Sequence, residues 1–134
     1  MNTDSSLKRH ALGLLVGLAV QYLLGMAINV YVQFPNNESA GQLWEFSWHQ
    51  PLVAVHIVLA ILLFTGSLAL AIKAQKAKDT NMRLPAWIGF IAIFAAGFMG
   101  SRFIPTQQDP YSYGMAVCFL IAFAALCWGL YRAK

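Results

Sequence analysis

Two histidines lie seven positions apart at the edge of an apolar run, in the stretch WHQPLVAVH at residues 48–56. If one helix carried both His49 and His56, they would share a face about 10 Å apart. That separation is too large for one small metal ion, whose bonds to nitrogen are about 2 Å long. The pair is therefore not a two-ligand metal motif.

Pro51 divides this stretch into two parts. Proline is favoured at the first position of a helix and pushes the preceding residue away from helical angles. We therefore expect a helix to begin at or just before Pro51, with His49 at the membrane boundary and His56 about one and a half turns inside an apolar run. An ionisable residue inside a membrane span suggests a functional role. The alternative is a neutral histidine hydrogen-bonded to Asn29, Gln33 or a backbone carbonyl.

Methionines at comparable depth in the other apolar runs are possible partners of His56. Counted inward from the outer ends, these are Met26, Met99 and Met115. A histidine and a methionine on facing helices, here His56 and Met115, can ligate the iron of a heme b. Histidine with several methionines also suits a soft ion such as Cu(I). Methionine is equally common as core filler, so both interpretations stay open.

Asn29 and Arg102 would complete a binding pocket near the outer ends of the spans. Asn29 belongs to a ladder at four-residue spacing: Gly13, Gly17, Gln21, Gly25, Asn29 and Gln33. Small residues and amides on such a stripe typically pack and hydrogen-bond against other helices, and the alternative is that Asn29 lines a cavity. Arg102 could bind a heme propionate or a quinone-like head, or extend to the lipid headgroups.

These candidates must be positioned by four apolar runs, at residues 11–34, 51–72, 84–104 and 111–131. Each has about 20 residues or more, which matches a hydrocarbon core about 30 Å thick, and segments in that layer form helices. The short connections predict an all-α, antiparallel four-helix transmembrane bundle as one domain over residues 1–134. The outer segment, residues 35–50, could form a short amphipathic helix in the membrane interface.

The charged residues indicate the orientation of these spans. Basic residues flank the spans on one side, at Lys8, Arg9, Lys73, Lys76, Lys78, Arg83, Arg132 and Lys134, whereas Arg102 lies on the other. This asymmetry predicts a multi-pass plasma-membrane (inner-membrane) protein with both termini cytoplasmic. Only 10% of the residues are charged, against about 25% in soluble domains. The net charge of +4 therefore reflects topology and does not indicate nucleic-acid binding.

Several classes of chemistry lack the residues they need. No aspartate or glutamate lies within an apolar run, which disfavours small proton-coupled exporters. Cys118 and Cys127, nine positions apart in one run, cannot pair with each other. No combination of serine, cysteine and histidine indicates nucleophilic catalysis, so we expect a protein that is not an enzyme.

Three stretches, LLGMAINVYVQFP, HIVLAILLFTGSLALAIKA and AAGFMGSRF with DPYSYGMAVCFLIAFA, cover most of the four runs. Together they resemble a family of small four-span bacterial membrane proteins to which no chemistry is assigned. The stretch WEFSWHQPLVAVHIVLAILL is similar to the histidine-bearing second helix in each half of heme A synthase. That resemblance implies a heme between the second and fourth helices, where this chain has Met115 in place of a second histidine.

Three functions remain open from the sequence. The first is electron transfer with heme b or a quinone-like lipid bound by His56, Met26, Asn29, Met99, Arg102 and Met115. The second is a non-catalytic accessory or assembly subunit whose glycine-rich faces bind another membrane protein or a second copy of the chain. The third is a small transporter. It would need to oligomerise to form a transport path, since four helices alone provide few intramembrane polar groups.

Overall fold

The computed structural model describes residues 3–35 and 38–133 of the chain. Its elements within these ranges are all α-helices: α1 (Thr3–Tyr31), α2 (Ala40–His49), α3 (Pro51–Lys76), α4 (Arg83–Thr106) and α5 (Asp109–Arg132). The all-helical prediction is therefore confirmed. Residues 36–37 of the predicted outer segment lie outside the described ranges.

Four of these helices, α1, α3, α4 and α5, are long and apolar enough to cross a membrane. Their outward faces carry large apolar side chains that a soluble protein would bury, among them Val16 and Leu23 on α1 and Leu120 on α5. Apolar surface of this extent marks contact with lipid or with another protein. By length and composition the chain is thus a multi-pass membrane protein.

The helices extend past most ends of the apolar runs on which they were predicted. For example, α1 starts at Thr3 and α3 continues to Lys76, beyond the apolar boundaries at residues 11 and 72. A helix satisfies its backbone internally in water as well as in lipid, so the end of an apolar run need not end the helix. The predicted start of α3 is confirmed: Pro51 is its first residue, after an extended Gln50.

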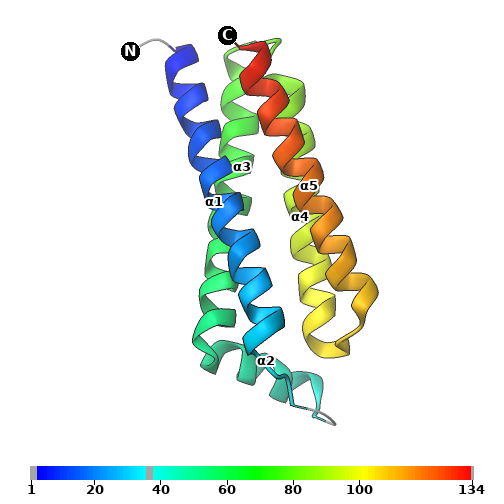
Figure 1. Ribbon diagram of the computed structural model, residues 1–134. Coiled ribbons are helices and arrows are strands. Elements are labelled where there is room, and N and C mark those ends of the chain that lie inside the picture. Colours follow the sequence, from blue (N-terminus) through cyan, green and yellow to red (C-terminus); the bar gives the residue numbers. More distant parts are fainter. Residues whose placement is uncertain (1–2, 36–37, 134) are drawn as a thin grey trace.

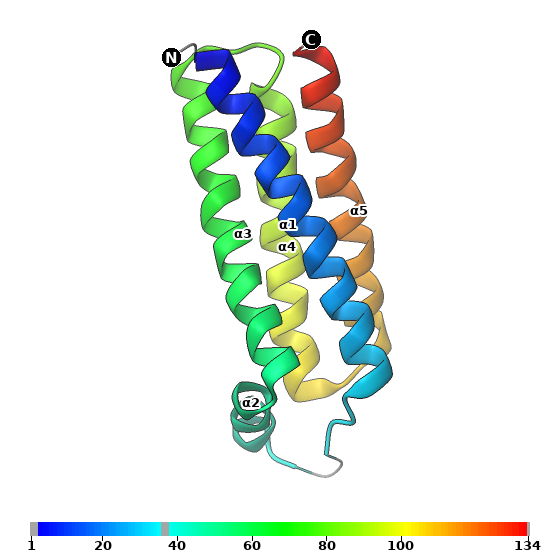
Figure 2. The same cartoon turned by 60° about the vertical axis from the view of Figure 1, so that its left-hand side comes forward.

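The two ends of the chain lie together at one end of the molecule, and α2 lies at the opposite end (Figure 1). α1 runs obliquely across the other helices (Figure 2). Along this path Leu14 of α1 lies against Gly66 of α3, and Tyr22 of α1 stacks on Phe119 of α5 with ring centroids 5.0 Å apart. α4 in turn packs on both α3 and α5.

The short helix α2 forms where the sequence allowed an interfacial amphipathic helix. Ser39 starts it with a capping box, in which Ser39 and Gln42 satisfy each other's backbone N–H groups. Leu43 and Ser47 face the other helices and are buried. His49 ends the helix exposed, with its Nδ1 2.9 Å from the carbonyl oxygen of Glu45. His49 is thus a surface residue of α2, separate from His56.

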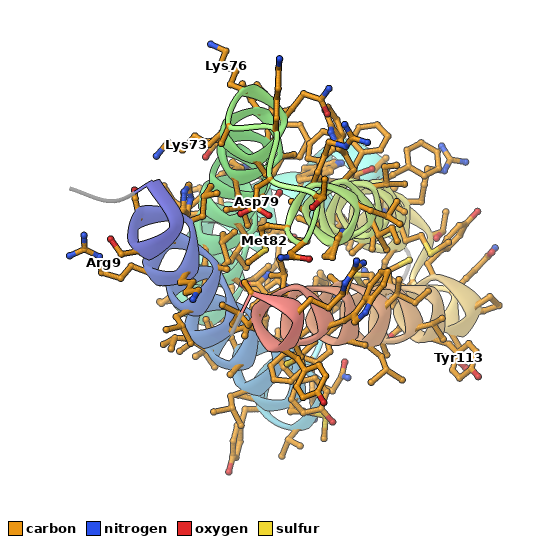
Figure 3. The ribbon with its side chains drawn as sticks, turned by 90° about the horizontal axis from the view of Figure 1, so that it is seen from above. Arg9, Lys73, Lys76, Asp79, Met82 and Tyr113 are labelled. Atoms are coloured by element: carbon orange, nitrogen blue, oxygen red, sulfur yellow. The ribbon has the colours of Figure 1, made fainter. Side chains whose placement is uncertain are left out.

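Most of the fully buried apolar side chains lie in the half of the molecule that contains the chain ends. Its buried cluster includes Leu7, Leu70, Met82 and Leu126, which come from four different segments. Viewed from this end, Lys73, Lys76 and Arg9 project outward, whereas Met82 lies between the helices (Figure 3).

The turn between α3 and α4 also lies at this end, and Asp79 shapes it. The carboxylate of Asp79 accepts hydrogen bonds from the backbone N–H groups of Asn81, at 2.9 Å, and Met82, at 3.0 Å. These bonds satisfy two backbone donors at the start of α4, where the helix itself offers no acceptor.

The two cysteines of α5 do not form a disulfide, as their spacing predicted, because Cys118 and Cys127 are both free.

Candidate functional site

A cavity of about 580 Å³ lies in the half of the molecule nearer α2. It is lined by side chains from all five helices, and most of the lining is apolar. The volume falls within the range of small-molecule pockets, about 300–1,000 Å³. Its polar lining residues are Gln21, Asn29, His56, Ser101 and Ser112, with the amphipathic Tyr22 and Trp44.

Small residues on α4 and the lack of buried residues in the first half of α5 leave room for the cavity. All buried residues of α5 lie between Ala122 and Gly129, near the chain ends. The facing stretch of α4 contributes Ala96, Gly97 and Gly100 to the lining. Side chains this small leave a space that the oblique α1 does not fill.

Aromatic rings pack against one another at two places along the cavity. At the α2 end, Phe34 packs on Phe46 of α2, at 5.5 Å between ring centroids, and on Phe103 of α4, at 6.1 Å. Between α1 and α5, Tyr22 stacks on Phe119. Rings at these separations attract one another and so stabilise the contacts between these helices.

His56 lies on the wall of the cavity, against α1. The amide nitrogen of Gln21 donates to the backbone carbonyl of His56 at 3.1 Å and joins α1 to α3. One turn further, a Cβ on Gly25 would lie 3.4 Å from the Cε1 atom of His56. The absence of a side chain at Gly25 thus makes room for the imidazole ring.

Two polar atoms at this contact are buried without a hydrogen-bond partner in the described parts of the chain, Nδ1 of His56 and Oε1 of Gln21. Each such atom costs about 1–3 kcal/mol. The hydrogen bond from His56 to Asn29, Gln33 or a carbonyl that the sequence allowed does not form at Nδ1. Unsatisfied buried groups are uncommon in native proteins and often mark functional sites.

The three methionines expected around His56 have different positions. Met26 and Met115 line the cavity, whereas Met99 does not. The sulfur of Met99 lies against Gly114, and that of Met115 lies 3.1 Å from where a Cβ of Gly100 would be. Both sulfur atoms therefore fill gaps left by glycines between α4 and α5.

Asn29 and Arg102, the remaining predicted pocket residues, also separate. Asn29 lines the cavity near the α2 end. Arg102 has an exposed side chain and is not part of the lining. Within residues 3–35 and 38–133, no three histidine, cysteine, aspartate or glutamate side chains come together as a metal-ligand set.

Several lining residues were not expected from the sequence. Gln21 appeared there only as a packing residue, and its predicted bond across helices is observed as the bond to α3. Trp44, which belongs to the predicted interfacial segment, also lines the cavity. The four-residue ladder on α1 was the available signal, since Gln21, Gly25 and Asn29 of that ladder all line the cavity.

This arrangement suits a largely apolar molecule with a small polar group that reaches His56. No protein-family model matches the chain, and no curated protein or solved structure matches it either.

Proposed function

We propose that the protein is a small plasma-membrane protein that binds a membrane-soluble ligand, heme b or a quinone-like lipid, in the cavity beside His56. In this proposal α1, α3, α4 and α5 form an antiparallel transmembrane bundle with both termini in the cytoplasm. The observation that carries it is the cavity of about 580 Å³, whose apolar lining surrounds a few polar groups. In this orientation α2 faces outward, so the ligand would bind in the outer half of the membrane.

The orientation can be tested with single cysteines introduced at Glu38 and Thr80, after Cys118 and Cys127 are replaced by alanine. Both new positions are exposed outside the candidate spans. The excess of basic residues around Thr80 predicts that it lies in the cytoplasm. In intact cells, a membrane-impermeant maleimide should therefore label Glu38→Cys and not Thr80→Cys, and permeabilised cells should label both. The reverse pattern would contradict the orientation.

Binding can be followed by the fluorescence of Trp44, which is half-buried and lines the cavity. We expect saturable quenching when the purified protein in lipid nanodiscs is titrated with hemin or with a 1,4-benzoquinone that carries a ten-carbon tail. The saturable part should be lost in Trp44→Phe and retained in Trp128→Phe, since Trp128 lies outside the lining, near the C-terminal end. Quenching without saturation by both probes would refute a binding site in this cavity.

A further inference from the structure

The cavity lining carries no ionised counter-charge. Within the described ranges, no lysine, arginine, aspartate or glutamate lines it. An ionic ligand would therefore bury its charge without a partner, which is costly in an apolar environment. Arg102, the basic residue that could have paired with the carboxylates of a heme, is exposed and outside the lining. The lining thus favours an uncharged ligand.

The ring nitrogens of His56 point to the same class of ligand. A histidine that ligates a metal almost always donates its other ring N–H to an acceptor, which fixes the tautomer. Nδ1 of His56 is buried and has no acceptor among the described residues. A proton on Nδ1 would be buried without an acceptor, so we assign the proton of the neutral ring to Nε2. His56 lines the cavity, so its Nε2–H would suit an oxygen acceptor there, whereas iron at Nε2 would move the proton to the buried Nδ1, which has no acceptor in the described part of the chain.

The cavity also reaches the surface of the molecule between two pairs of helices. Between α3 and α4 its lining includes Ile61, Phe94 and Phe98, whose side chains are 54%, 57% and 61% exposed. Between α1 and α5 it includes Met26, which is 47% exposed. In a membrane these edges face lipid tails, so an apolar tail could extend from the cavity into the bilayer.

We infer that the ligand is an uncharged lipid with a carbonyl-bearing head, of the quinone type, and that Nε2–H of His56 donates to its carbonyl oxygen. This inference rests on the proposed function and narrows it by setting heme aside. The head lies beside His56 and Gln21, and the tail leaves the bundle at one of the two exposed edges, between α3 and α4 or between α1 and α5. Ser112 lies on the same lining and offers a hydroxyl group to other polar atoms of the head, whereas the hydroxyl of Ser101 already donates to the carbonyl of Phe98 at 2.7 Å.

The test compares His56→Leu with His56→Gln in nanodiscs, with the tailed benzoquinone and hemin as probes and Trp44 quenching as the readout. Glutamine keeps an N–H donor and leucine does not, while both have similar size. We expect His56→Leu to weaken benzoquinone binding about five- to tenfold, the effect of one buried hydrogen bond, and His56→Gln to recover most of that loss. Hemin should give no Soret band that depends on His56.

Three results would overturn the inference, and they differ in what they leave standing. A hemin Soret band lost in both variants would replace the quinone with heme and leave the proposed cavity intact. Equal benzoquinone affinity in the wild type, His56→Leu and His56→Gln would rule out the hydrogen bond from His56. The proposed binding site in the cavity would remain. If neither probe gives saturable quenching in the wild-type protein, the proposed function itself is refuted.

Discussion

Replacing Gly97 with leucine should reduce ligand binding by more than tenfold. Gly97 lines the cavity, and a Cβ built on it would have no atom of the described residues within 4 Å. Because Gly97 is exposed, the added side chain would stand at the open edge of the cavity and narrow the ligand space without pushing another helix. A tenfold loss corresponds to about 1.4 kcal/mol, less than the burial of a leucine-sized apolar group is worth. Titration of Trp44 fluorescence with the benzoquinone and with hemin would measure it.

Gly13→Leu is the matched control for this substitution. Gly13 also lies on a long helix with no described atom within 4 Å of an added Cβ, but it is outside the lining. We expect its affinity for both probes to equal that of the wild-type protein. If Gly97→Leu and Gly13→Leu bind equally well, the ligand does not occupy this cavity.

Replacing Gly129 with alanine should destabilise the fold by about 1–3 kcal/mol, the usual cost of overpacking a well-packed interior. A Cβ on Gly129 would lie 2.7 Å from the sulfur of Met82 and 2.9 Å from Cβ of Pro85. The flexible side chain of Met82 can move, but the ring of Pro85 is fixed to the first turn of α4. The clash therefore pushes α5 away from α4. Unfolding by sodium dodecyl sulfate titration in mild detergent would measure the loss.

The matched comparison is Gly13→Ala, which adds the same methyl group on a helix with open space around it. Alanine favours helix over glycine, so this variant should be as stable as the wild-type protein or slightly more so. Equal stability of Gly129→Ala and Gly13→Ala would show that α4 and α5 do not pack closely at Met82.

The positions of the helices along the chain, and the depth of the candidate residues within them, could be predicted from the sequence because the relevant signals are local. The length of an apolar run predicts a span, and Pro51 predicted the start of α3, which the structure has at that residue. Depth within a span follows from the rise per residue, which is why Met26, Met115 and His56 were predicted at one level. Met26, Met115 and His56 do line one cavity.

The direction in which each side chain points could not be predicted in the same way. In a soluble helix the apolar stripe identifies the buried face. In a membrane helix the lipid-facing side is as apolar as the interior, so the pattern does not show which face packs. Met99 illustrates this, since it shares the depth of Met115 but packs against Gly114 outside the cavity lining.

The sequence by itself therefore determined the number of candidate spans, the depth of each residue within its span, the charge asymmetry at the ends of the spans and the separation of His49 from His56. Only the tertiary structure decided that α1 crosses the other helices obliquely, that Gln21 and Gly25 meet His56, and that a cavity remains where α4 and α5 carry small residues. The reason is that a cavity depends on the rotation and separation of helices far apart in the chain. In lipid these are set by close packing of side chains rather than by hydrophobic periodicity.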